Sequence, residues 1–364
     1  MRPHRLSSPF RCDGPRDIHT GPGCCSRRSV LGGIAALGAS AFCGGNAGAQ
    51  QPAEKPFRID VHHHLSSPGF IAEIGGRRTG QVPLMRWTVS KSIDEMDQGG
   101  VATSILSVSE PGVFFGNYDG ARALARECND FGAKLIADYP GRFGMFAIVP
   151  MPDVESTLKE ISYALDTLKV DGICMMTDYQ GKFLGDAAFT PIMEELNRRK
   201  AIVFTHPNRN DCCRNLIPDV PEPIIELGTD TARTIASLLF SGTAAKFPDI
   251  QWIFSHAGGT APGLMQRFVA YFDQRKDLQS RLPQGPAYYM QRFCYDTASA
   301  TTVYPLAALT KIVRPTQILL GTDSPFGTAK EASAGLRLTG MFSAAEIEGI
   351  ERGNAARIMP RYRA

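Results

Sequence analysis

The chain has no strong surplus of charge of either sign, which excludes several classes of protein. Its 364 residues carry 39 basic and 36 acidic side chains, a formal net charge of +3. Six Arg and two Asp lie in the first 49 residues, so residues 50–364 hold 33 basic and 34 acidic side chains. A body so close to neutral offers no general electrostatic surface for nucleic acid or for an anionic membrane.

A disulfide framework is also absent from the sequence pattern. Four of the nine cysteines lie in the first 49 residues, which leaves an odd number without paired spacing: Cys128, Cys174, Cys212, Cys213 and Cys294. Adjacent Cys212 and Cys213 could bridge each other only with strain, so we interpret all five as packing or loop residues. With 43% hydrophobic residues, the composition is that of a globular chain with a large core and excludes a disordered or collagen-like protein.

The N-terminal segment has the order of an export signal. Arg27 and Arg28 directly precede an apolar run over residues 30–44, and Ala47-Gly48-Ala49 follows as a small-x-small cleavage pattern. Four glycines in that run argue against a packed helix, and the run is too short for a confident membrane span. We therefore predict a twin-arginine signal peptide at residues 1–49. The mature protein is expected to be periplasmic or secreted, with no stable membrane anchor after cleavage.

After residue 56 the chain alternates short apolar runs with amphipathic stretches. The runs predict strands at residues 57–62, 103–109, 143–149, 172–177, 201–206, 250–256, 293–297 and 317–322. The stretches predict helices, among them residues 119–137, 154–168, 191–199 and 231–247. Apolar runs with little polar alternation are typical of parallel strands covered on both faces. Eight such units over about 300 residues predict a (β/α)₈ barrel, a TIM barrel, for residues 50–364.

Two features refine this fold prediction. A doubly wound open sheet is the alternative, but Val61-His62-His63-His64 ends the first strand where that fold more often has a glycine-rich phosphate turn. Residues 65–91 separate the first strand from its helix. This segment is too long for an ordinary loop between a strand and a helix, so we predict that it forms a lid or a pocket wall.

The chain has few histidines, seven in all, and most of them lie at strand ends. Side chains alternate along a strand, so His62 and His64 share one face and His63, which we interpret as structural, takes the other. The carboxyl ends of barrel strands meet at one rim, where active sites are built. The side chains expected at this rim are His62, His64, His206, His256 and Asp323. Imidazole and carboxylate groups are ligands of Zn²⁺ and similar ions, so the set predicts a metal site.

These segments resemble the metal-dependent amidohydrolase superfamily. The matching motifs are Asp60-Val61-His62-His63-His64, Thr205-His206-Pro207, Ser255-His256-Ala257-Gly258-Gly259 and Gly321-Thr322-Asp323-Ser324-Pro325. Within the superfamily the chain is similar to the amidohydrolase-2 branch, which includes aminocarboxymuconate semialdehyde decarboxylase. Segments such as Asp138-Tyr139-Pro140-Gly141-Arg142 look most like enzymes of the 6-methylsalicylate decarboxylase type.

The resemblance implies a ligand set and a proton carrier. It makes His62, His64, His206 and Asp323 the metal ligands, and it makes His256 the catalytic acid or base, with Asp323 as the other candidate proton donor. Many binuclear relatives place a Lys at the end of strand four, whereas residues 172–177 contain none, so we expect one divalent ion. Zn²⁺ is the expected ion and Mn²⁺ the alternative, because both accept three imidazoles and a carboxylate.

The resemblance also implies substrate contacts and a partner. Arg267, eleven positions after His256, matches an arginine that grips the substrate carboxylate from across a dimer interface, so a homodimer is expected. Candidates for a further arginine contact from the first loop are Arg77, Arg78 and Arg86. Candidates for an aromatic wall of the substrate pocket are Trp87, Phe114 and Phe115.

The implied activity is the non-oxidative decarboxylation of an aromatic or unsaturated carboxylic acid, for example a 2-hydroxybenzoate such as 6-methylsalicylate. The ion would orient the carboxylate and an adjacent oxygen, and protonation of the ring carbon would make loss of CO₂ feasible. A hydrolase of a lactone, ester or amide is the alternative, because the same ligand set can activate water. A non-catalytic metal-binding protein is a third reading, which the complete ligand set disfavours.

Overall fold

The computed structural model describes residues 56–76, 81–214 and 216–363. All of them belong to one compact unit, Ala53–Ala364. The predicted signal peptide at residues 1–49, and Arg77 and Arg78 in the first loop, lie outside the described residues.

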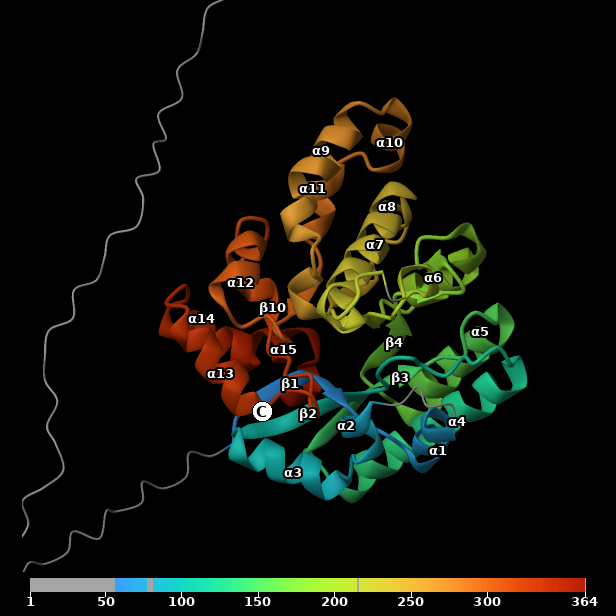
Figure 1. Cartoon of the computed structure of the whole chain (residues 1–364), viewed down its shortest axis with the longest axis vertical. Helices are drawn as coiled ribbons and strands as arrows, with labels where there is room; N and C mark the ends of the chain where they lie inside the picture. The colour runs from blue at the N-terminus through green and yellow to red at the C-terminus, as the bar shows by residue number, and fades with distance from the viewer. Residues whose placement is uncertain (1–55, 77–80, 215, 364) are drawn as a thin grey trace, which may run out of the picture. The chain divides into compact units, whose positions relative to one another are not determined.

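Eight of the described strands form one parallel sheet in the order β1-β2-β3-β4-β7-β8-β9-β10 (Figure 1). Their bounds are β1 Arg58–His64, β2 Val101–Ser107, β3 Phe143–Ile148, β4 Gly172–Met176, β7 Ile202–His206, β8 Gln251–Phe254, β9 Cys294–Asp296 and β10 Ile318–Leu319. The first and last strands are joined as well, because the Val61 amide donates to the Leu320 carbonyl and the Asp323 amide to the His62 carbonyl, both at 2.9 Å. The sheet is therefore close to a closed barrel, in agreement with the (β/α)₈ prediction.

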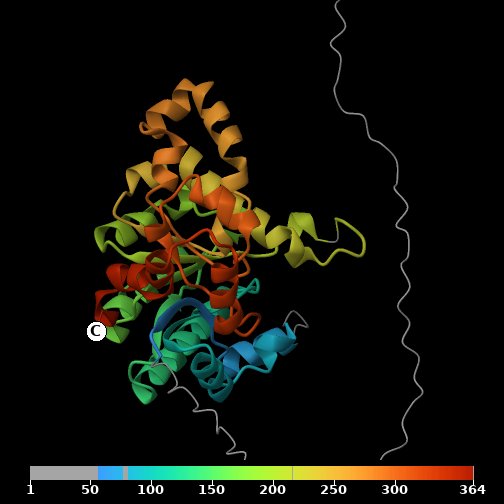
Figure 2. The same cartoon turned by 90° about the vertical axis from the view of Figure 1, so that its left-hand side faces the viewer.

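Helices cover the outside of this sheet (Figures 1 and 2). The longer ones are α1 Pro68–Gly76, α3 Val89–Gln98, α4 Tyr118–Asp138, α5 Val154–Ser162, α6 Thr190–Arg198, α7 Glu226–Phe240, α9 Met265–Asp273, α12 Val303–Thr310 and α13 Ala329–Leu338. The shorter ones are α2 Val82–Met85, α8 Thr243–Lys246, α10 Lys276–Arg281, α11 Gly285–Met290, α14 Ala344–Glu348 and α15 Asn354–Ile358. A two-stranded hairpin, β5 Asp178–Tyr179 and β6 Lys182–Phe183, follows β4. Among the described residues no helix has the length and apolar character needed to cross a membrane.

Helix α4 illustrates how a helix is attached to the barrel. Asn117 caps its first turn by accepting from the Gly120 amide, and the buried positions recur every three or four residues, as expected for a helix with one face on a core. Asn129 on this buried face bonds both the carbonyl and the amide of Ile148, at 2.8 and 2.9 Å. Polar groups at the end of β3 are therefore satisfied by the helix that covers it.

The structure refines two predicted segments. The predicted lid or pocket wall at residues 65–91 contains α1, α2 and the start of α3, and Gln81 from this segment lines two cavities. The predicted helix at residues 231–247 is two helices, α7 and α8, separated at Gly242, which has a φ of 84°. A left-handed residue ends an α-helix, and glycine adopts that conformation without steric cost.

Candidate metal centre and substrate cavity

The four predicted metal ligands meet at the carboxyl ends of the strands. His62 and His64 are on β1, His206 ends β7, and Asp323 follows β10. One ligand atom from each lies within 4.8 Å of all the others. His62 Nε2 and His64 Nε2 are 3.2 Å apart, and they lie 3.2 and 3.0 Å from Asp323 Oδ1. The three imidazoles are buried.

The outer nitrogen of each imidazole fixes the orientation of the ring. Nδ1 of His62, His64 and His206 is bonded, in order, to the Asp296 carboxylate at 2.8 Å, the Ser107 carbonyl at 3.3 Å and the Pro207 carbonyl at 2.9 Å. Because these partners can only accept, each neutral ring carries its proton on Nδ1 and directs the lone pair of Nε2 to the centre. Three lone pairs and a carboxylate at such distances repel one another unless a cation lies between them. The donor set therefore fits one divalent ion.

Electrostatics lead to the same conclusion. Burial disfavours the charged form of His62, but Asp296 and Asp323 outweigh this effect and raise its pKa to about 10. Burial lowers the pKa of His64, and burial with the neighbouring imidazoles lowers that of His206 well below its usual value. Burial acts to raise the pKa of Asp323, yet the imidazoles around it hold that pKa well below its usual value. Neutral His64 and His206 and ionised Asp323 are the forms of these side chains that bind a divalent ion.

His256, the predicted acid or base, lies beside this cluster. Its ring centroid is 5.2 Å from that of His62, and its Nδ1 bonds the Ala298 carbonyl at 2.9 Å. Its Nε2 is buried and has no hydrogen-bond partner within the described part of the chain. His256 and Ala257 have positive φ angles of 54° and 56°, an uncommon backbone conformation that often marks functional sites. The arrangement leaves Nε2 free to bind or release a proton in the cavity.

A cavity of about 460 Å³ opens over these groups, and its size suits a small molecule. Three kinds of side chain line it. The metal end contributes His206, His256 and Asp323. An apolar wall includes Pro223, Ile224, Leu227, Ala300, Pro305 and Phe326. A polar edge consists of Gln81, Ser109 and Glu110, and the polar residue Ser299 also lines the cavity.

The structure does not bring Trp87 to this cavity. Its side chain is 7% exposed within the core, and its indole N–H donates to Ser92 Oγ at 3.1 Å. Ser92 Oγ also contacts His63 Nε2 at 2.8 Å, and His63 Nδ1 bonds Asp60 at 3.0 Å. Trp87 therefore belongs to a buried network behind the metal centre. Phe114 and Phe115 line a second cavity of about 900 Å³, which shares Gln81 and Glu110 with the first.

The two described arginines predicted to contact the substrate lie outside the cavity. Arg267 is exposed on α9 and is not a lining residue. Arg86 follows α2, is exposed, and accepts a bond from Lys91 Nζ through its carbonyl at 2.9 Å. Within one subunit, neither side chain lines the cavity that holds the metal ligands.

Three residues at the site carry roles that the sequence analysis did not assign. Asp296 ends β9 and holds His62 through Oδ2, while its Oδ1 accepts from the amides of His256 and Ala298 at 2.9 and 3.0 Å. Ser109 and Glu110 follow β2 and form most of the polar edge of the cavity. All three lie at or just after strand ends, as the metal ligands do. This position in the sequence is the feature that could have indicated a role at the site.

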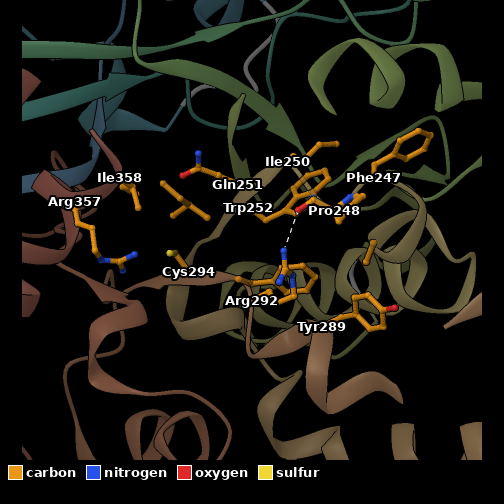
Figure 3. Close-up of a pocket in the computed structure, with 13 residues that line it drawn as sticks. Phe247, Pro248, Ile250, Gln251, Trp252, Tyr289, Arg292, Cys294, Arg357 and Ile358 are labelled. Carbon is orange, nitrogen blue, oxygen red and sulfur yellow. Dashed lines mark hydrogen bonds between the residues drawn. The ribbon is translucent and has the colours of Figure 1, made fainter. Parts of the chain in front are cut away.

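A further cavity of about 140 Å³ lies at the other end of the barrel (Figure 3). It is lined by residues at the amino ends of β8 and β9, among them Trp252, Tyr289 and Arg292, and Arg292 Nη2 donates to the Pro248 carbonyl at 3.3 Å. In barrels of this type the amino ends of the strands serve stability and the carboxyl ends carry the chemistry. The metal end is therefore the candidate active site.

Known proteins are similar to this chain in sequence and in fold. Residues 59–361 match the family model described as amidohydrolase. The chain is 36% identical over 325 residues to decarboxylase macB of Penicillium terrestre, covering 84% of this chain and 96% of that protein. It is 34% identical over 319 residues to the 6-methylsalicylic acid decarboxylase of Penicillium expansum, covering 84% and 97%. A dihydroxybenzoic acid decarboxylase from Polaromonas sp. JS666, solved with bound manganese and the inhibitor 2-nitroresorcinol, matches with a TM-score of 0.72 at 23% identity, covering 85% and 98%.

Proposed function

This chain belongs to the amidohydrolase family, and we propose that it is a metal-dependent decarboxylase of an aromatic carboxylic acid, with 2-hydroxybenzoates such as 6-methylsalicylate as the substrate class. The observation that carries the proposal is the meeting of three imidazoles and a carboxylate at a cavity that His256 also lines, with the Nε2 of His256 buried and without a partner among the described residues. The chain matches nearly the whole length of relatives that are decarboxylases, and this match supports the reaction type.

The residues of the site have distinct tasks in this reaction. A bound divalent ion would supply a positive charge that holds the substrate carboxylate together with its neighbouring oxygen. Nε2 of His62, His64 and His206 and the carboxylate of Asp323 would hold it. His256 Nε2 delivers a proton to the ring carbon that bears the carboxylate. The C–C bond then breaks, its electron pair restores the aromatic ring, and CO₂ leaves.

His256 is better suited than Asp323 to carry this proton. The pKa of Asp323 is held well below its usual value, so this carboxylate has no proton to give near neutral pH. The bond from Nδ1 of His256 to the Ala298 carbonyl keeps its other nitrogen directed at the cavity. The apolar wall limits access of water to the ring, which favours proton transfer from a fixed side chain.

The test is release of CO₂ from 2-hydroxybenzoates by the purified, metal-loaded protein. We expect 6-methylsalicylate to yield CO₂ and 3-methylphenol, and His256→Ala to lower kcat by about 10²–10⁴-fold with the metal content unchanged. Hydrolysis of lactones, esters or amides without CO₂ release would support the alternative activity. Full activity of His256→Ala would remove His256 from the mechanism.

The identity of the ion is a finer proposal. We propose Zn²⁺, with Mn²⁺ as the alternative, because three imidazoles and a carboxylate suit both. The related Polaromonas enzyme was solved with manganese, which supports a divalent ion of this size at the site. Metal analysis of protein purified without added ions, followed by removal of the ion and restoration with each one separately, decides between them. Activity that survives complete removal would contradict any metal requirement.

Two further proposals concern the partner and the compartment. We propose that the mature protein is a homodimer in which Arg267 of one subunit contacts the substrate carboxylate in the other. Its exposure on α9 and its absence from the lining of its own cavity support this proposal. We also propose export by the twin-arginine route. Replacing Arg27 and Arg28 together by Lys should retain the uncleaved precursor in the cytoplasm, and unchanged export of this variant would overturn the assignment.

A further inference from the structure

Two adjacent cysteines lie in the loop that follows the metal ligand His206. Cys212 and Cys213 belong to a short 3₁₀ turn, Asp211–Cys213, and both thiols are free. Their sulfur atoms are 2.8 Å apart, whereas the bond of a disulfide is about 2 Å long. The Asn210 side chain accepts from the Cys212 amide at 3.2 Å, and the Asn210 carbonyl accepts from the Cys213 amide at 3.0 Å. The turn therefore holds the two thiols against each other.

The two thiols differ in their access to solvent. Cys212 is exposed, whereas Cys213 is 8% exposed and its sulfur accepts from Arg233 Nη2 at 3.4 Å. The hydrogen bond with Cys212 and burial raise the pKa of the Cys213 thiol, and the charge of Arg233 acts against this rise. An oxidant from solution therefore meets Cys212 first, with a second thiol already in contact. An accessible thiol beside a resolving thiol is the arrangement of redox-sensitive cysteines.

The turn adjoins residues that form cavity walls. The three residues before it, Asn208, Arg209 and Asn210, line the cavity of about 900 Å³. Arg209 Nε forms an ion pair at 2.8 Å with Glu110, which lines both this cavity and the metal-bearing one. A change in the backbone of the turn therefore reaches side chains beside both cavities.

Arg233 connects the cysteine pair to α7 and to the chain next to a metal ligand. Its guanidinium contacts the Cys213 sulfur and lies 3.8 Å from the Asp230 carboxylate. Asp230 in turn accepts from the Asn208 amide at 3.2 Å, two residues after His206. The chemical state of Cys213 is therefore linked through two contacts to the loop that leaves the metal centre.

A bond between these adjacent cysteines has unfavourable geometry, and this favours a labile bond over a structural one. The Cα atoms on either side of a trans peptide are about 3.8 Å apart, less than the span of about 4.4–6.8 Å in most disulfides. Such strain makes a disulfide easier to reduce, and easily reduced disulfides are typically regulatory or catalytic. The pair is therefore suited to a bond that forms and breaks.

We propose that Cys212 and Cys213 are a reversible dithiol–disulfide site whose oxidation rearranges the turn beside the cavities. The oxidant class is a small-molecule disulfide, for example oxidised glutathione. The Cys212 thiolate attacks one sulfur of this oxidant, which forms a mixed disulfide and releases one glutathione that takes up the proton from Cys212. The Cys213 sulfur then attacks that of Cys212, and the second glutathione leaves with the proton from Cys213. Two cysteine thiols are oxidised and one external disulfide is reduced to two thiols.

Thiol mapping of the full chain in mixtures of reduced and oxidised glutathione tests this site without any assay of activity, so its result does not depend on the proposed decarboxylase function. After equilibration the protein is unfolded, remaining thiols are alkylated, and tryptic peptides are analysed by mass spectrometry. Cleavage after Arg209 and Arg214 releases residues 210–214, which contain these two cysteines and no other. We expect this peptide to lose two hydrogen atoms and gain no alkyl group in oxidised glutathione, and to recover both thiols in excess reduced glutathione.

Single variants separate the roles of the two thiols. Cys213→Ser removes the resolving thiol, so Cys212 should accumulate as a mixed disulfide with glutathione. Cys212→Ser leaves only the buried thiol, so Cys213 should stay reduced under the same conditions. Cys294→Ser is the matched control, because Cys294 lies on β9 outside this loop, and it should leave oxidation of the pair unchanged. A wild-type pair that stays as two thiols in oxidised glutathione, or that accumulates the mixed disulfide as Cys213→Ser does, would overturn the proposal.

Hydrogen exchange measures the rearrangement of the turn. In the reduced protein the bonds from the Cys212 and Cys213 amides to Asn210 protect these amides from exchange. We expect oxidation to speed exchange within residues 210–214 by about ten-fold, because the strained bond weakens these contacts. The double variant Cys212→Ser with Cys213→Ser should exchange at the same rate with and without oxidant. Equal exchange in the reduced and oxidised wild type would contradict any rearrangement.

Discussion

Asp296 holds two parts of the metal centre in place at once. Its Oδ2 bonds Nδ1 of the ligand His62, and its Oδ1 accepts from the backbone amides of His256 and Ala298. The first contact fixes which nitrogen of His62 is protonated, and the second sets the backbone that presents His256 to the cavity. Such outer partners of a metal ligand determine its tautomer and its basicity.

Replacing Asp296 by Asn tests this role. If the Asn oxygen keeps the two backbone amides, its NH₂ group faces His62 Nδ1, so that nitrogen must accept and the ring proton moves to Nε2, where it opposes the ion. We expect metal affinity to fall by about 10–100-fold, measured by titration with a competing chelator. Asp171→Asn is the control, because Asp171 is also a buried carboxylate but precedes β4 at the opposite end of the barrel. Wild-type affinity in Asp296→Asn would contradict this role.

A second buried carboxylate supports the centre from behind. Asp60 Oδ1 accepts from the amides of His62 and Thr322 at 3.1 Å, and its Oδ2 bonds the Thr322 hydroxyl at 2.7 Å. Thr322 directly precedes the ligand Asp323, so Asp60 links the two strands that close the barrel. His63 bonds the same carboxylate on the face away from the metal, as the alternation along β1 predicts.

At the scale of elements, Asp230 joins α7 to the ends of two strands. Its carboxylate bonds the Thr177 hydroxyl next to β4 and accepts from the Asn208 amide at 3.2 Å, two residues after the ligand His206. Burial raises the pKa of Asp230 from 3.8 to about 6, and Arg233 at 3.8 Å acts against this rise. This contact therefore joins a helix to the loop that follows the ligand His206. The carboxyl of Asp230 retains its proton to a higher pH in the folded protein than in the unfolded chain.

Asp230→Asn should change the pH dependence of stability in a defined direction. The folded carboxyl keeps its proton up to about pH 6, whereas the unfolded one releases it near 3.8, so ionisation of Asp230 lowers stability as pH rises through this window. Asn keeps the acceptor and cannot ionise. We expect the free energy of unfolding of the variant, relative to wild type, to increase by on the order of 2 kcal/mol between about pH 4 and about pH 7, which thermal unfolding at each pH measures.

The difference between the two proteins isolates this carboxyl, because all other groups titrate in both. Asp94→Asn, on the exposed face of α3, is the control and should show no such trend. A constant difference in unfolding temperature across the same pH range would contradict the assignment.

Sequence patterns located the strands well because burial on both faces leaves a continuous apolar run. The predicted strand at residues 143–149 corresponds to β3, and the predicted strand at 201–206 to β7. The same patterns missed a helix end at Gly242. The left-handed backbone of Gly242 divides the predicted helix at residues 231–247 into two, and the spacing of apolar residues does not reveal a backbone conformation. Nor did they orient Trp87, because its direction depends on Ser92 and on the buried His63. Side chains that point inward from loops depend on contacts distant in the sequence.

The metal ligands could be predicted because their meeting depends on strand order and not on side-chain contacts within loops. His62 lies near the end of β1, His206 ends β7 and Asp323 follows β10, and the parallel order of a barrel brings such ends to one rim whatever their separation in the chain. Asp296 ends a strand too, yet a lone aspartate without a motif carries no signal of its task. Ser109 and Glu110 gain meaning only from the cavity, because a hydroxyl without a partner is a property of the folded structure.

At the scale of the whole molecule, α9 lies with α10 and α11 in a group of helices beyond the sheet (Figure 1). Arg267 on α9 is exposed and does not line its own cavity. A closed two-fold dimer would place the same surface of each subunit against the other and could bring this guanidinium to the partner's cavity. Light scattering of the mature protein tests the dimer directly.

Mixing two inactive variants tests whether Arg267 acts across the interface. Arg267→Ala keeps its own His256, and His256→Ala keeps its own Arg267. In a mixed dimer, the cavity of the Arg267→Ala subunit therefore has both groups, whereas the other cavity has neither. Random exchange of subunits should restore about a quarter of wild-type activity, because half of the dimers are mixed and half of their sites are complete. An Arg267 that serves its own cavity restores nothing on mixing, and full activity of Arg267→Ala alone would exclude the residue from substrate binding altogether.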